Sequence, residues 1–332
     1  MNILFRADGS SEKGMGHMVR SMALADEFKD RNHTVYFMVK EDEFAKEFVD
    51  KRGLKRLDYI DKKDLDLFAN ITDKHAIDLM ISDVDEYDNK FFSFLREKEI
   101  YSVQLDIHRK MTLGVDLLIN GGIYAKELED EALLEGQNVL LGPEYNLLRK
   151  EFSRANKKDH SEDIKNILIT MGATDVHNLT EVVTRTCLEV YSNAIIHVVV
   201  GSNKQPFDNK DFYKHSSLNL YYKIPYMYEL MEMADIAICS GGVTIYELVA
   251  TATPSIIITQ AKNQIRQSLE FSAREAAIYY GTAEDFDSNE FRKILFKIND
   301  PILRHKLSSS SRKLIDGKGV ERVVNYLLTQ LD

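Results

Sequence analysis

The sequence has little cysteine, no tryptophan and no long apolar run. Its two cysteines, Cys187 and Cys239, form no CxxC pair, so we expect reduced, buried thiols instead of disulfide bonds or a redox motif. The N-terminus leads directly into a predicted strand, without the basic and apolar segments of a signal peptide. No apolar run approaches the roughly 20 residues that a membrane-spanning helix needs. These absences predict a soluble, cytoplasmic protein.

An excess of positive charge is also missing. The 43 Lys and Arg residues are outnumbered by 53 Asp and Glu residues, which gives a formal net charge of −10. We therefore expect no nucleic-acid partner. A phosphate-bearing small molecule remains compatible with this charge, because backbone amides and a few local cations can bind it. The histidines other than His17 are scattered and show no metal-ligand spacing.

Strands and helices alternate along the chain without hairpin signals, which predicts doubly wound parallel sheets. The length of 332 residues suits two domains. We predict an N-terminal Rossmann-like domain over 1–152, a polar linker over 153–163 and a second Rossmann-like domain over 164–332, its last helix able to pack back on the first domain. The expected strands span residues 2–7, 33–40, 75–83, 101–107, 115–120, 164–172, 194–201, 236–239 and 255–259.

The first 25 residues read as a strand, a glycine-containing loop and a helix. Gly14 and Gly16 allow unusual backbone conformations and close approach of a ligand. His17 is expected at the start of the helix, at the carboxyl edge of the sheet, where open α/β sheets bind ligands. This position suits an acid or base in catalysis, and it equally suits a helix-capping or solvent-facing histidine. Arg20, one turn later, suits either binding of a carboxylate or phosphate or a surface ion pair.

Three loops of the second half follow predicted strands. Ser240–Thr244 contains Gly241 and Gly242 and leads into a helix that carries Glu247, so its amides suit a diphosphate and Glu247 suits ribose hydroxyls. The alternative is that these residues form only a tight turn, with Glu247 exposed to solvent. Gly172-Ala173-Thr174 is a second loop of small residues. Asn263-Gln264 is a third polar pair, which suits either helix capping or a hydrogen bond to a sugar.

Four segments together resemble the PseG family, hydrolases of UDP-2,4-diacetamido-2,4,6-trideoxy-β-L-altropyranose in pseudaminic acid biosynthesis, which are related to MurG-like GT-B glycosyltransferases. The segments are RADGSSEKGMGHMVRSMALA, LLGPEYNLLRKEF, ILITMGATDVHNLT and ADIAICSGGVTIYELVATATP…AKNQ. The resemblance runs from Met1 to about Gly281. It implies a GT-B fold, in which two Rossmann-like domains face a central cleft.

The resemblance also implies roles for individual residues. His17 would be the catalytic residue that activates water, with inversion at the anomeric carbon and without metal or cofactor. The residues implied for the nucleotide are Gly172, Ala173, Thr174, Ile224, Met227, Ser240, Gly241, Gly242, Val243, Thr244 and Glu247. Those expected near the sugar or phosphate are Arg6, Asp8, Gly14, Gly16, Asp83, Asp85, Asn263 and Gln264.

The sequence departs from the family pattern mainly around the sugar. Asp85 stands where the family usually has tyrosine, and Val243 and Tyr246 replace the usual Ser or Thr and Trp. These changes concern the identity of the sugar more than the nucleotide. We therefore predict a UDP-sugar hydrolase. The alternative is a GT-B glycosyltransferase, and the third hypothesis is a sugar-nucleotide-binding protein without activity.

Overall fold

The computed structural model describes residues 1–9, 15–105, 114–128, 138–154, 163–172, 175–201, 206–222, 224 and 227–331. The chain forms two compact units: unit 1 is Met1–Lys150 with Lys318–Asp332, and unit 2 is Glu151–Gly317. The last helix belongs to unit 1, the domain on which the predicted division allows it to pack back. Residues 155–162 of the predicted linker lie outside the described part.

Unit 1 is built on a seven-stranded parallel sheet in the order β3-β2-β1-β4-β5-β6-β7. Its core order, 3-2-1-4-5-6, is that of Rossmann folds, as predicted. The strands are β1 (Asn2–Ala7), β2 (Thr34–Met38), β3 (Lys55–Leu57), β4 (Leu79–Asp83), β5 (Tyr101–Leu105), β6 (Leu117–Asn120) and β7 (Val139–Leu141).

Side chains cap the starts of α2 (Glu43–Asp50), α3 (Leu65–His75) and α4 (Asn89–Glu97) in unit 1. Asp42, Asp64 and Asp88 each accept a hydrogen bond from a backbone amide of the first turn that follows. The other helices are α1 (Gly16–Asp30) and α12 (Gly319–Leu331), with 3₁₀ turns η1 (Ala125–Leu128) and η2 (Pro143–Tyr145). A third such turn, η3 (Lys150–Arg154), begins at the boundary with unit 2.

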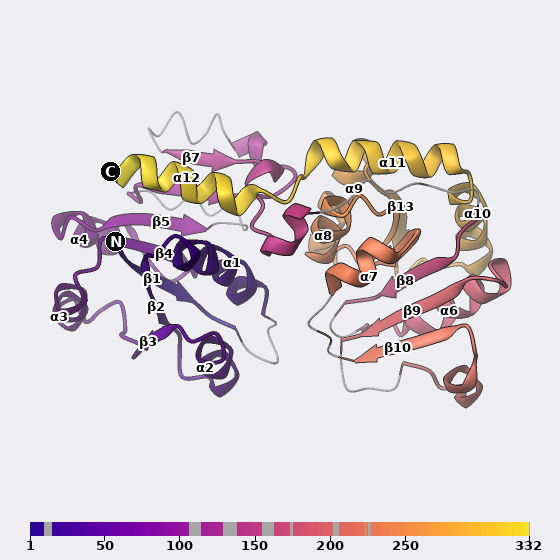
Figure 1. Ribbon diagram of the computed structural model, residues 1–332, viewed down its shortest axis with the longest axis horizontal. Helices are drawn as coiled ribbons and strands as arrows, with labels where there is room; N and C mark the ends of the chain where they lie inside the picture. Colours follow the sequence, from indigo (N-terminus) through magenta and orange to yellow (C-terminus); the bar gives the residue numbers. More distant parts are fainter. Residues whose placement is uncertain are drawn as a thin grey trace. The chain divides into compact units, whose positions relative to one another are not determined.

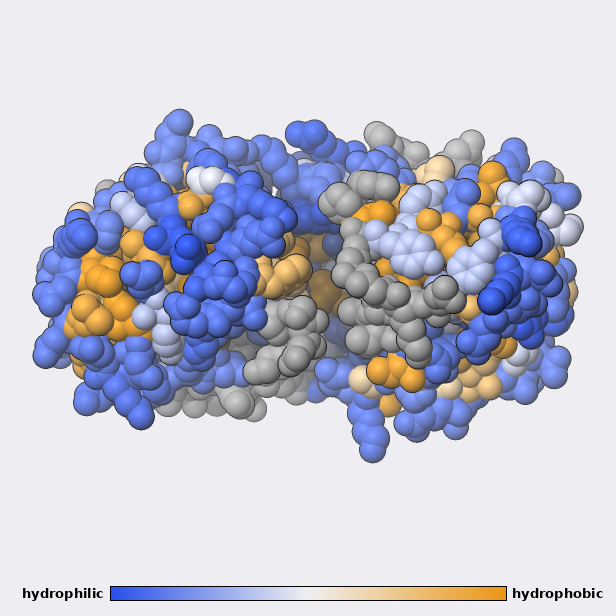
Figure 2. All heavy atoms as spheres, turned by 90° about the horizontal axis from the view of Figure 1, so that it is seen from below, coloured by the Kyte–Doolittle hydropathy of each residue, from blue (hydrophilic) through white to orange (hydrophobic). Residues whose placement is uncertain are grey.

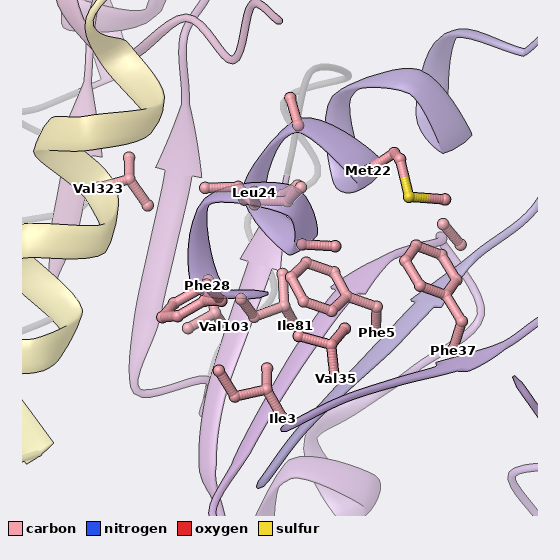
Figure 3. Close-up of a cluster of buried hydrophobic side chains, with 14 of the residues drawn as sticks. Ile3, Phe5, Met22, Leu24, Phe28, Val35, Phe37, Ile81, Val103 and Val323 are labelled. Carbon is pink, nitrogen blue, oxygen red and sulfur yellow. The ribbon is translucent and has the colours of Figure 1, made fainter. Parts of the chain in front are cut away.

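The core of unit 1 explains why α12 returns to it. Helix α12 lies beside α1 (Figure 1) and buries Val323 in the same cluster as Phe5 and Phe28 (Figure 3). Phe5 stacks on Phe37 with 5.3 Å between ring centroids. Alternation along β1 places Ile3, Phe5 and Ala7 in this cluster. Leu4 belongs to a second cluster, with side chains of α3 and α4.

Unit 2 repeats the design with a six-stranded parallel sheet in the order β10-β9-β8-β11-β12-β13. Its strands are β8 (Asn166–Thr170), β9 (Ile195–Val200), β10 (Leu218–Tyr222), β11 (Ile236–Cys239), β12 (Ser255–Thr259) and β13 (Ile278–Thr282). Its helices are α6 (Leu179–Val190), α7 (Met227–Met233), α8 (Thr244–Ala250), α9 (Lys262–Ala273), α10 (Ser288–Ile298) and α11 (Pro301–Leu314), with the 3₁₀ turn η4 (Lys210–Lys214). Cys187 and Cys239 are free and buried, which confirms that expectation.

Among the helices of the described residues, none combines the length and apolar character required to cross a bilayer. Figure 2 shows hydrophilic side chains over much of the face in view, interrupted by smaller hydrophobic areas.

The strand predicted over 75–83 is shorter, because His75 closes α3 and Ala76 adopts a left-handed conformation with φ 46°.

Candidate active site

His17 contacts a buried carboxylate at the carboxyl edge of the unit 1 sheet. It is the second residue of α1, and its side chain is 39% exposed. Its Nδ1 atom lies 2.8 Å from Oδ1 of Asp83, the last residue of β4. Strands β1 and β4 are neighbours, with Ala7 opposite Asp83. Neighbouring parallel strands end at the same edge of a sheet. The start of α1, which follows β1, therefore lies beside the end of β4, and this brings His17 and Asp83 into contact.

Asp83 is almost completely buried and has several donors. Arg20 donates from Nε to Oδ2 at 2.5 Å and from Nη2 to Oδ1, and Ser21 donates from Oγ to Oδ2 at 3.3 Å. Burial alone would raise the pKa of Asp83, but the Arg20 charge and the hydrogen bonds from His17 and Arg20 lower it below its ordinary value. Asp83 is therefore ionised at neutral pH. Arg20 thus forms an ion pair within the chain, with a buried carboxylate and not at the open surface.

Two contacts of Nδ1 bear on which ring nitrogen of His17 carries a proton. The Nδ1 atom lies within hydrogen-bond distance of both Asp83 Oδ1 and, at 2.9 Å, Arg20 Nη2. An Nδ1–H group would donate to the Asp83 oxygen, whereas an unprotonated Nδ1 would accept from Arg20 Nη2–H. In the tautomer with the proton on Nδ1, Nε2 is the proton acceptor of the ring.

Arg6 lies on the other face of the same sheet. It is fully buried and donates to both oxygens of Asp8, at 2.5 and 2.9 Å, and to Glu86 at 2.7 Å. Lys40 donates to Glu86 at 2.6 Å, and the Tyr59 ring lies 5.0 Å from the Arg6 guanidinium carbon. The Arg6 guanidinium is thus paired within unit 1, with Asp8 and Glu86, and it does not lie beside His17.

The remaining residues predicted near the sugar have different surroundings. Gly16 is the first residue of α1, and a Cβ there would meet nothing within 4 Å. Asp85 is exposed. Gly14 lies outside the described residues.

In unit 2, the glycines after β8 and β11 lie around one serine. Gly172 has φ +83°, and a Cβ there would lie 3.0 Å from Ser240 Oγ. A Cβ at Gly242 would lie 3.9 Å from Ser240 Oγ and 3.9 Å from Gln264 Nε2. Four residues predicted from three separate loops (Gly172, Ser240, Gly242 and Gln264) are therefore close together at the carboxyl edge of this sheet.

Helix α9 packs tightly on the glycine pair after β11. A Cβ on Gly241 would lie 2.5 Å from Ser268 Oγ and 2.9 Å from Thr259 Cγ2. Gln267 donates from Nε2 to the Gly241 carbonyl oxygen. Gly241 is therefore required for packing.

Two of the polar residues hold these loops in place. Gln264 accepts a hydrogen bond from the backbone amide of Gln260 at 2.9 Å, just before α9 begins. Gln260 in turn donates to the carbonyl oxygen of Met171 at 2.8 Å. Gln260 and Gln267 were not predicted, although both are polar residues close to the predicted Asn263-Gln264 pair.

The remaining predicted residues of unit 2 include the starts of two helices and positions of different exposure. Met227 begins α7, and Thr244 begins α8 with Glu247 in its first turn. Val243 and Asn263 are exposed and Ile224 is half-buried. Ala173 and Thr174 lie outside the described residues. Within the described part of the chain, no three His, Cys, Asp or Glu side chains gather as a metal ion would require.

The chain is similar to a glycosyltransferase domain and to a named UDP-sugar hydrolase. Residues 166–316 match the glycosyltransferase family 28 C-terminal domain. The chain is 25% identical over 276 residues to a UDP-2,4-diacetamido-2,4,6-trideoxy-β-L-altropyranose hydrolase of Campylobacter jejuni, covering 80% of this chain and 93% of that protein. The resemblance to the PseG hydrolases is confirmed.

Other relatives of this PseG-like chain are similar over comparable lengths. A Bacillus subtilis spore coat polysaccharide biosynthesis protein, SpsG, is 27% identical over 344 residues, covering 98% of each chain. An uncharacterized Methanocaldococcus jannaschii protein is 30% identical over 278 residues, covering 80% of this chain and 57% of its own length. This chain thus spans little more than half the length of that archaeal relative.

Solved structures establish the fold of this PseG-like chain. Acinetobacter baumannii MurG superposes with a TM-score of 0.72 at 11% identity, covering 99% of this chain and 100% of MurG. A Staphylococcus aureus MnaA structure with UDP has a TM-score of 0.66 at 13% identity, covering 99% and 96%. The fold is GT-B, as predicted.

Proposed function

We propose that this protein hydrolyses a UDP-activated diacetamido-trideoxyhexose to UDP and the free sugar, in pseudaminic or related nonulosonic acid biosynthesis. The observation that carries the proposal is the contact between His17 Nδ1 and the buried Asp83, because it leaves Nε2 as a base. The name of the Campylobacter relative supplies the substrate class. The match of residues 166–316 to a glycosyltransferase C-terminal domain supports a UDP-sugar ligand.

In this proposal, unit 2 binds the nucleotide. The backbone amides of Gly172 and of Ser240–Thr244, with Ala173 and Thr174, hold the diphosphate. Glu247 binds the ribose hydroxyls, and Ile224 to Met227 contact the uracil. Asn263 and Gln264 lie against phosphate or sugar. The closeness of Gly172, Ser240 and Gly242 supports a common phosphate-binding role for their loops.

His17 acts on the attacking water. Nε2 takes one proton from the water as its oxygen bonds to the anomeric carbon, and the bond from that carbon to the diphosphate oxygen breaks with inversion. Asp83 holds Nδ1–H throughout and stabilises the imidazolium that forms. The diphosphate leaves as an anion, so amide donors can stabilise it without a general acid or a metal ion. A pair of glycosidase carboxylates is then unnecessary.

The second candidate is a glycosyltransferase that uses the same base on an acceptor hydroxyl. The family 28 domain and the MurG structure favour this alternative. Both reactions release UDP, and they differ in whether an acceptor is needed.

Release of UDP without an acceptor separates the candidates. We expect the protein to release UDP from UDP-2,4-diacetamido-2,4,6-trideoxy-β-L-altropyranose in buffer alone, at an unchanged rate when a chelator is present. Release that requires an added sugar or lipid acceptor would support the transferase. Binding of UDP with no turnover under either condition would contradict both enzymatic readings.

A further inference from the structure

The loop after β8 is tied at both ends to one side-chain nitrogen. Gln260, the residue that follows β12, donates from Nε2 to the carbonyl oxygen of Met171 at 2.8 Å and to Oδ1 of Asp175 at 3.2 Å. A carboxamide nitrogen carries two hydrogens, so it can serve both acceptors at once. Gly172 follows Met171 directly, and Gln260 therefore connects the residues on either side of this glycine loop.

The bond to Met171 also sets the direction of the Gly172 amide. The Met171 carbonyl and the Gly172 N–H belong to one planar peptide unit, and the described residues contain no cis peptide bond. In a trans unit, the C=O and N–H groups point in opposite directions. The N–H of Gly172 therefore points away from Gln260. In the described part of the chain, no hydrogen bond is made by this N–H, which leaves it available to an anion.

The second acceptor of Gln260 is fixed by the first turn of α6. Asp175 accepts hydrogen bonds from the backbone amides of Leu179 at 3.0 Å and Thr180 at 2.9 Å, and from the Thr180 hydroxyl at 2.6 Å. The Asp175 carboxylate is thus held by α6 as well as by Gln260. It gives the Gln260 side chain a fixed anchor next to the Met171 carbonyl.

Gln260 is in turn held by the helix that contacts the second glycine loop. Its backbone N–H donates to Oε1 of Gln264 at 2.9 Å. Further along α9, Gln267 donates to the Gly241 carbonyl oxygen. Helix α9 therefore contacts the loop after β11 directly, and it is linked to the loop after β8 through Gln260.

We propose that Gln260 is a positioning residue for the diphosphate, which holds the Gly172 N–H in the direction that binds a phosphate oxygen. This inference rests on the proposed binding of UDP by unit 2. It separates two tasks, because the amide of Gly172 binds the anion, whereas Gln260 acts through Gly172 by orienting that amide.

The first test observes the Met171–Gly172 peptide unit by NMR. In the full chain labelled with ¹³C-carbonyl methionine and ¹⁵N-glycine, only directly joined Met–Gly pairs give a signal, and the sequence has two, Met15–Gly16 and Met171–Gly172. A Met15→Leu variant identifies the first pair, which then serves as the internal reference from unit 1. We expect Gln260→Met to shift the Met171–Gly172 signal, because the carbonyl loses its donor, and to leave the reference in place.

The second test compares UDP with uridine, which lacks the diphosphate. We expect Gln260→Met to bind UDP roughly tenfold more weakly than the native protein, measured by calorimetry. Its affinity for uridine, measured by NMR titration, should be unchanged. Gln260→Ala is the second variant if the methionine side chain disturbs folding. Gln330→Met is the matched control, because it makes the same chemical change at an exposed position of α12 and should bind both ligands as the native protein does.

The ratio of the two affinities distinguishes positioning from a general structural role. An equal loss of affinity for UDP and uridine would overturn the inference, because a loosened unit 2 would bind both ligands less well. Native UDP affinity in the Gln260 variants would overturn it too, as would an unmoved Met171–Gly172 signal. These results would leave the proposed function intact. If the native protein binds no UDP, the proposed function and the role of Gln260 fall together.

Discussion

The Nδ1 atom of His17 and the Oδ1 atom of Asp83 lie 2.8 Å apart, although 66 residues separate them in the chain. Asp83 is the end of a buried strand and His17 is at the start of a helix. The contact therefore depends on the placement of β4 beside β1, and it gives a surface imidazole a fixed orientation.

Asp83→Asn should slow UDP release at least about tenfold, because the amide no longer fixes Nδ1–H or stabilises the imidazolium. Affinity for UDP should be unchanged, since we assign nucleotide binding to unit 2. Steady-state kinetics and calorimetry with UDP measure the two effects. Ser21→Ala, which removes the long 3.3 Å contact to Asp83, is the matched control and should be close to native. Native turnover by Asp83→Asn would remove Asp83 from the mechanism.

Asp83 should also make stability dependent on acid pH. Its pKa is lowered in the folded protein, so its stabilising effect is present above the unfolded value of about 3.9 and is lost as the pH falls below it. We expect the free energy of unfolding of the native protein to decrease below about pH 4, and that of Asp83→Asn to change less over the same range. Urea unfolding at several pH values tests this, and parallel curves for the two proteins would argue against it.

Arg6 is expected to matter for folding more than for catalysis. Arg6→Met leaves Asp8 and Glu86 without their buried partner, which should cost about 3–5 kcal/mol of stability. Lys40→Met is the matched control on the same carboxylates, because Lys40 is about half exposed and its loss should cost under about 1 kcal/mol. Denaturant unfolding measures both. Equal losses in the two variants would show that the burial of Arg6 is unimportant.

Gly241 and Gly242 should respond differently to alanine. At Gly241 the new methyl group meets Ser268 and Thr259, so we expect a loss of about 1–3 kcal/mol in stability as well as weaker UDP binding. At Gly242 the nearest atoms are 3.9 Å away, so stability should be nearly native. The methyl group there faces Ser240 and Gln264, and UDP binding should still weaken. Native UDP affinity in Gly242→Ala would exclude this loop as the phosphate site.

The local elements could largely be predicted from sequence, because buried parallel strands are apolar runs and amphipathic helices repeat every three to four residues. The predicted bounds of β1, β11 and β12 are those observed. Strand β13 was missed, since its IYYGT sequence is only partly buried and contains a glycine. The return of α12 to unit 1 was left open, because an apolar face does not specify which core it joins.

The candidate residues could be found individually, but their pairings could not. His17, Asp83 and Arg20 were each noted, yet their contact depends on strand order, which no local pattern reveals. The position of Arg6 was open to prediction: alternation along β1 places it opposite Phe5 and Ala7, on the face away from α1. Its expected place near the sugar or phosphate stays a prediction.

The most direct test of the account is the single-turnover rate of UDP release by His17→Gln, measured together with its dissociation constant for UDP. Glutamine can still donate to Asp83 but cannot act as a base near neutral pH. The account predicts a rate about 10²- to 10⁴-fold below native with unchanged UDP affinity. A native rate in this variant would contradict the claim that the imidazole of His17 activates the attacking water.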